Sequence, residues 1–276
     1  MRIVLRLAYD GTDFHGWARQ PELRSVQEVL EAGLNRILRL QDPVRTVCAG
    51  RTDAGVHAHD QWVHFDVPDE AWQALGDRAE HRLRGVLPDD VQVLATSVAP
   101  HGFDARFSPL WRRYSYRICD DPKGVDPLRR RTILTHHRPL DVTAMHAAAQ
   151  LLVGQHDFAA FCKQREGATT IRGLQRLDVS RERDDIVRAD LVADAFCHSM
   201  VRSLMGALMA VGDGRQDIEW PLRVLQSGVR DPNVAVVAPH ALVLEEVAYP
   251  DPEQLAHRAE LTRARRTLVD PSSDGY

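Results

Sequence analysis

The order of its hydrophobic patterns constrains this chain more than any other feature, because the same order occurs twice. Each half of the sequence alternates strand-like and helix-like patterns as strand, helix, strand, strand, helix, strand. This β-α-β-β-α-β order is that of the ferredoxin-like split unit. The first half predicts strands at 2–9, 44–49, 60–67 and 91–98 and helices at 25–40 and 70–84. The second half predicts strands at 111–119, 171–182, 186–195 and 242–249 and helices at 141–153, 199–211 and 219–228.

We therefore predict an α+β fold made of two tandem ferredoxin-like (RRM-like) units. Their strands are expected to join into one continuous antiparallel sheet, with the helices on one face and an open cleft on the other. The expected division is 1–105 for the N-terminal subdomain, 106–250 for the C-terminal subdomain and 251–276 for a peripheral extension. A length of 276 residues fits about two domains. Open sheet faces of this kind are common platforms for RNA.

Composition and cysteine usage narrow the class of protein. No stretch approaches the ~18 apolar residues of a membrane span, and Arg6 and Asp10 interrupt the apolar N-terminus. These features predict a cytoplasmic protein without a membrane segment. The four cysteines are far apart and form no C-x-x-C pair, so free, mostly buried thiols are expected.

The tightest group of histidines is His57, His59 and His64. A metal site is one interpretation, since the first two can share a strand face. No H-E-x-x-H helix or Cys/His quartet accompanies them, so we favour polar surface or hydrogen-bonded histidines and expect no metal.

Charge is distributed unevenly along the chain. The net charge is −4 and the pI is about 6.3, which by themselves argue against nucleic acid. Between residues 106 and 138, however, nine basic residues face three acidic ones. The segment therefore predicts a basic surface on an otherwise acidic protein. This basic segment either binds phosphate groups or is a solvent-exposed loop.

A polar loop between two predicted strands carries the strongest candidate for chemistry. Two glycines, Gly50 and Gly55, give this loop the backbone freedom to present Asp53 outward. Arg51 is close enough in sequence to pair with Asp53 and keep it ionised. A tight D-x-G turn in which Asp53 bonds its own backbone is the structural alternative.

Several motifs in a fixed order resemble the tRNA pseudouridine synthase A family, and the resemblance covers nearly the whole chain. The most specific motif is the octapeptide that begins at Gly50. The others lie on both sides of it, in the order of the family. The matching segments are Gly50-Arg51-Thr52-Asp53-Ala54-Gly55-Val56-His57, Tyr9-Asp10-Gly11-Thr12, Gly16-Trp17, Ser25-Val26-Gln27-Glu28, Phe103-Asp104-Ala105-Arg106-Phe107-Ser108, Arg112-Arg113-Tyr114-Ser115-Tyr116, His156-Asp157-Phe158, Ala195-Phe196, Met200-Val201-Arg202 and Leu242-Val243-Leu244. The chain departs from the family at Cys197-His198-Ser199, Ser203 and Val243.

The resemblance implies an isomerase that converts uridine to pseudouridine at positions 38, 39 and 40 in the anticodon stem-loop of tRNAs. It implies Asp53 as the catalytic nucleophile, and Tyr114, Arg51 and Arg202 as substrate-binding residues. It also implies a homodimer whose partner is tRNA. Because the reaction is an isomerisation without redox change, no cofactor is expected.

Two other functions fit the same residues. A non-catalytic tRNA-binding module would use the sheet and the basic segment, with the Gly50–His57 loop only structural. A ribosyl hydrolase would use Asp53 to admit water and release uracil.

Overall fold

The computed structural model describes residues 1–163 and 169–263, and these form two compact units. The first unit contains residues 1–114 together with 242–263, and the second contains residues 115–241. This grouping differs from the division expected from the sequence, because residues 242–263 follow the second unit in the chain but pack with the first.

The first unit has a sheet with the strand order β4-β1-β3-β10, and the short strand β2 also pairs with β3. β1 runs antiparallel to both of its neighbours, β3 and β4. β10 runs parallel to β3, so the prediction of a purely antiparallel sheet is wrong here. β10 comes from a distant part of the sequence, so no hairpin turn sets its direction. The elements are β1 (Arg2–Tyr9), α1 (Val26–Leu38), β2 (Val47–Cys48), β3 (His57–Asp66), α2 (Asp69–Gln73), α3 (Ala79–Arg84), β4 (Val91–Val98), β10 (Leu242–Ala248) and α7 (Leu255–Arg263).

Local sequence signals explain where the helices of this unit begin and end. The Ser25 hydroxyl accepts a hydrogen bond from the Glu28 amide at 3.4 Å, which caps α1 as predicted. The single helix predicted over 70–84 is wrong. It is two short helices, α2 and α3, separated by a 3₁₀ turn that begins at Gly76. Gly76 has a φ of +55°, a conformation that interrupts a right-handed helix and that glycine adopts readily.

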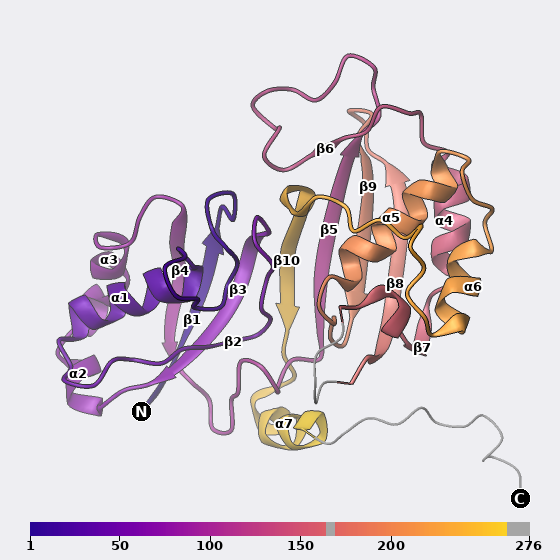
Figure 1. Cartoon of the computed structure of the whole chain (residues 1–276). Coiled ribbons are helices and arrows are strands. Elements are labelled where there is room, and N and C mark those ends of the chain that lie inside the picture. The colour runs from indigo at the N-terminus through magenta and orange to yellow at the C-terminus, as the bar shows by residue number, and fades with distance from the viewer. Residues whose placement is uncertain (164–168, 264–276) are drawn as a thin grey trace, which may run out of the picture. The chain divides into compact units, whose positions relative to one another are not determined.

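The second unit has strands in the order β5-β9-β8-β7, and β6 pairs in parallel with the end of β5. The helices α4, α5 and α6 pack together, and α4 lies on β8 (Figure 1). The strands β6 and β7 were not predicted, because they are short and β7 is mostly polar. The elements are β5 (Trp111–Cys119), which begins in the first unit, β6 (Leu134–Thr135), α4 (Val142–Gln150), β7 (Gly154–Asp157), β8 (Ile171–Arg181), β9 (Val187–Ala193), α5 (Met200–Gly212) and α6 (Trp220–Ser227).

The helix α5 forms the centre of the second unit. All of its residues except Arg202 are buried, which agrees with its apolar composition. In the described ranges no helix is long and apolar enough to span a membrane.

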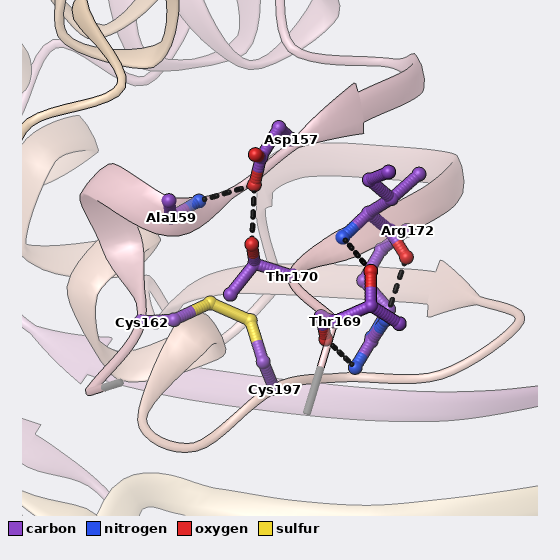
Figure 2. The surroundings of a disulfide bond; sticks show 8 residues. Asp157, Ala159, Cys162, Thr169, Thr170, Arg172 and Cys197 are labelled. Carbon is purple, nitrogen blue, oxygen red and sulfur yellow. Dashed lines mark hydrogen bonds between the residues drawn. A yellow bond between two sulfur atoms is a disulfide. The ribbon is translucent and has the colours of Figure 1, made fainter. Parts of the chain in front are cut away.

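The expectation of four free thiols is wrong for one pair. Cys162 and Cys197 form a disulfide, with their Cα atoms 5.8 Å apart (Figure 2). The first cysteine follows a 3₁₀ turn, Ala159–Phe161, whose first amide donates to the Asp157 carboxylate at 3.0 Å. The same carboxylate also accepts from the Thr170 hydroxyl (Figure 2). Cys48 and Cys119 are free and buried, as expected.

The C-terminal extension is more than a peripheral helix. Leu255 of α7 is 2% exposed and packs with a cluster that includes Val4, Phe103 and Ala105. The Ser108 hydroxyl donates to the Leu255 carbonyl at 3.2 Å, which ties the helix to the centre of the first unit. The loose end expected after this helix lies outside the described residues.

Candidate active site

The loop from Ala49 to Val56 joins β2 to β3 and presents Asp53, which is half-buried. Asp53 opens a turn in which the Val56 amide donates to the Asp53 carbonyl at 3.2 Å. Gly55 has a φ of +78°, as the third residue of a type II turn requires. The tight turn of the structural alternative is therefore present. A hydrogen bond between backbone atoms, from the Val56 amide to the Asp53 carbonyl, closes it.

The N-terminal motif segment packs its backbone directly against this loop. The Trp17 amide donates to the Thr52 carbonyl at 3.0 Å, and the Gly55 amide donates to the Phe14 carbonyl at 3.1 Å. Gly11 approaches so closely that a Cβ atom there would lie 2.0 Å from the Val56 carbonyl oxygen. The two segments thus pack closely together, with backbone hydrogen bonds on both sides of Asp53.

Buried polar side chains join the same two segments. The Tyr9 hydroxyl lies 2.8 Å from the Thr52 hydroxyl oxygen, and burial raises the pKa of Tyr9. The His57 Nδ1 accepts a hydrogen bond from the Gly11 amide at 3.0 Å and lies 3.1 Å from Asp10. These contacts bring the motifs at Tyr9 and Gly50 together in the fold.

The three histidines considered as metal ligands have separate roles. His64 accepts a hydrogen bond from the Ala105 amide at 2.9 Å, and His59 lies 2.9 Å from Glu245. His57 accepts from the Gly11 amide, so His57 and His64 are hydrogen-bonded and His59 is a polar surface residue, the two kinds of role that were predicted. Within residues 1–163 and 169–263, no group of three or more His, Cys, Asp or Glu side chains is placed to hold a metal ion.

Arg112 belongs to the basic segment in sequence but is buried beside the loop of Asp53. It is 6% exposed, and its guanidinium donates to the carbonyls of Ala49 and Arg106, each at 2.8 Å. Other cations of the segment pair with carboxylates, so the expected surplus of positive charge is partly neutralised. These pairs are Arg113–Glu246, Arg117–Glu182, Arg129–Asp184 and Arg138–Asp213.

Tyr114 lies beside the loop that carries Asp53. It is 7% exposed, and a Cβ atom added to Gly50 would lie 3.7 Å from its hydroxyl. Burial raises the pKa of Tyr114 well above its ordinary value, and the negative charge of Asp53 raises it further. The hydroxyl therefore stays protonated at neutral pH. Tyr114 therefore lies near enough to Asp53 for the carboxylate charge to disfavour the ionised form of the tyrosine.

The other two candidate residues occupy different surroundings. Arg51 has an exposed side chain on the same loop as Asp53. Arg202 belongs to the second unit, in the first turn of α5, where its Nε donates to the Val237 carbonyl at 2.7 Å. Three of the four candidates therefore lie in the first unit.

Comparison with known proteins assigns the chain to a family. Residues 148–250 match a family model described as tRNA pseudouridine synthase. A tRNA pseudouridine synthase A from Frankia casuarinae is 57% identical over 272 residues, covering 99% of this chain and 98% of that protein. Relatives of the same name from Streptomyces griseus and Corynebacterium glutamicum are 53% and 46% identical, over 97% and 99% of this chain and 95% and 98% of theirs. With identity of this level along nearly its full length, the chain belongs to the tRNA pseudouridine synthase A family.

Proposed function

We propose that this protein isomerises uridine to pseudouridine in tRNA, at positions 38, 39 and 40 of the anticodon stem-loop. The observation that carries the proposal is the loop around Asp53. It is braced by backbone and side-chain contacts from the Tyr9–Trp17 segment, and the buried hydroxyl group of Tyr114 lies beside its first glycine, Gly50. The names of the relatives supply the reaction and the tRNA substrate, and the positions rest on the resemblance of the motifs.

The chemistry explains why a carboxylate is needed. The bond between uracil N1 and ribose C1′ breaks, the base turns and a bond forms between C5 and C1′. The proton on C5 then leaves, and N1 takes up a proton. Atoms and electrons balance within the nucleotide, with one proton exchanged, so no redox cofactor takes part. In this proposal Asp53 is the nucleophile, since a carboxylate held in a rigid loop is suited to covalent catalysis.

The other candidate residues bind the substrate. The target uridine must leave the base stack before an enzyme can reach C1′. Arg51 is exposed and can fill the space that the extruded nucleotide leaves in the stack. Tyr114 offers a ring for stacking and a protonated hydroxyl for proton relay. Arg202 is assigned to substrate binding by the resemblance of its motif.

The architecture and assembly follow the same proposal. We propose two ferredoxin-like units, for which the order β4-β1-β3 with β2 on β3 is the support in the first unit. We also propose a cytoplasmic homodimer that holds tRNA across both subunits.

A tritium-release assay tests the proposed reaction. We would incubate the protein with an anticodon stem-loop labelled with tritium at uridine C5, and measure both the released tritium and the mass of the RNA. A synthase releases tritium and leaves the mass otherwise unchanged. A hydrolase leaves an abasic site and free uracil, and a non-catalytic module leaves the RNA unaltered. Either of these two outcomes contradicts the proposal.

A further inference from the structure

Gln61 on β3 contacts the loop of Asp53 through both the oxygen and the nitrogen of its side-chain amide. Its side chain is fully buried, with 0% exposure. Its Nε2 donates to the Gly50 carbonyl at 2.7 Å, and its Oε1 accepts from the Gly50 amide at 3.4 Å. One amide side chain therefore holds both backbone groups of the first glycine in the loop.

The second hydrogen of the Gln61 amide extends this contact toward Asp53. Gln61 Nε2 also donates to the Tyr9 hydroxyl oxygen at 3.4 Å. An amide NH₂ group can only donate, so the Tyr9 hydroxyl oxygen accepts at this contact. The same hydroxyl is hydrogen-bonded to the Thr52 hydroxyl, 2.8 Å away. A chain of hydrogen bonds thus joins Gln61 through Tyr9 to Thr52, the residue that precedes Asp53.

These contacts fix the backbone on both sides of Arg51. Gln61 holds Gly50 directly and Thr52 through Tyr9. We propose that Gln61 is a positioning residue that aims Asp53 through Gly50 and Thr52. This inference rests on the catalytic role proposed for Asp53. A displacement of about 1 Å at a reacting group can reduce a rate by about 10²-fold, so the fixed geometry matters for turnover.

The donor hydrogens of Gln61 provide a specific test. Gln61→Glu keeps the size and shape of the side chain but replaces NH₂ with oxygen, which can donate to the Gly50 carbonyl only when the carboxyl is protonated. Burial raises the pKa of such a carboxyl. We expect the single-turnover rate of this variant, divided by that of the wild type at each pH, to increase as the pH is lowered. Gln61→Met lacks donors at every pH and should be about 10²-fold slower throughout.

A matched control lies in the second unit. The Gln150 amide donates to the Leu177 carbonyl at 2.9 Å, so Gln150→Met removes the same kind of bond away from the loop. Its single-turnover rate should stay within about threefold of the wild type. Rates are compared at saturating protein, so that changes in tRNA affinity do not contribute.

Hydrogen exchange of peptides covering residues 49–57 gives a readout that does not require activity. We expect Gln61→Met to accelerate exchange there and Gln150→Met to leave it unchanged. The inference is overturned if Gln61→Met keeps its rate within threefold of the wild type, if the relative rate of Gln61→Glu is independent of pH, or if exchange at 49–57 is unaltered. An inactive wild type instead refutes the proposed reaction, and the exchange experiment then decides whether Gln61 positions the loop.

Discussion

Gly11→Ala is a single-methyl change whose effect on the loop of Asp53 follows from one distance. A Cβ atom at position 11 would lie 2.0 Å from the Val56 carbonyl oxygen, whereas a carbon and an oxygen in contact are separated by about 3.3 Å. The methyl group therefore forces the two backbones about 1.3 Å apart. The atoms in contact are main-chain atoms on both sides, so no side chain can rotate away.

This separation should affect both stability and turnover. Overpacking of this kind costs about 1–3 kcal/mol of unfolding free energy. A shift of about 1 Å at Asp53 should reduce the single-turnover rate of pseudouridine formation by about 10²-fold, equivalent to about 2.7 kcal/mol.

The assay combines thermal unfolding with single-turnover kinetics, and Gly85→Ala is the matched control. A Cβ atom at position 85 would meet its nearest neighbours at 3.6 Å, which is ordinary contact, so this variant should behave like the wild type. Wild-type stability and rate in Gly11→Ala would refute the argument that the close approach of the two segments positions Asp53.

Three further predictions concern other contacts. Tyr114→Phe should bind tRNA as the wild type does but react about 10²–10⁴-fold more slowly, because it lacks the hydroxyl for proton relay. A binding assay and single-turnover kinetics would measure the two effects. An unchanged rate would mean that Tyr114 only stacks on the base. The Arg181 guanidinium lies 2.7 Å from the Asp120 carboxylate and lowers the pKa of Asp120 in the folded protein. The ionised carboxylate therefore stabilises the fold at any pH above the pKa of Asp120 in the unfolded chain. This stabilisation is lost as the pH falls through the lower pKa of the folded state. Asp120→Asn should therefore cost about 1–3 kcal/mol at pH 7 but less near pH 2 in urea unfolding, and a pH-independent cost would contradict the pairing. The Cys162–Cys197 disulfide joins residues 35 apart in the sequence. A reductant should therefore lower the unfolding free energy of the wild type by about 3–4 kcal/mol and leave that of Cys162→Ser unaffected. An equal response of the two proteins would contradict a stabilising disulfide.

The parts of the fold that sequence predicts well are those with a strong local pattern. The strands β1, β4 and β5 begin and end at the residues predicted from apolar alternation, and the Ser25 and Asp141 caps mark the starts of their helices. The strand β7 has too little apolar content to produce a pattern. The parallel pairing of β10 with β3 and the Cys162–Cys197 disulfide depend on contacts between distant segments, which local patterns do not encode.

The candidate site shows the same limit. The motif around Asp53 predicts a loop, a turn and a candidate carboxylate from neighbouring residues alone. Gln61 and Arg112 hold this loop from positions 11 and 63 residues away in the chain, and nothing in their local sequence indicates those contacts. In the sequence, Arg112 is indistinguishable from the other arginines of the basic segment. Its burial becomes evident only when the structure shows its carbonyl partners.

Pseudouridine formation by Asp53→Asn tests the central claim most directly. Asparagine suits the turn at this position as well as aspartate does, so the variant should fold with the stability of the wild type and bind tRNA. Its product should fall below detection in a single turnover, while Asp13→Asn, which changes an exposed carboxylate of the neighbouring segment, should remain active. Multiple turnovers by Asp53→Asn, with deamidation to aspartate excluded by mass spectrometry, would contradict the assignment of Asp53 as the nucleophile.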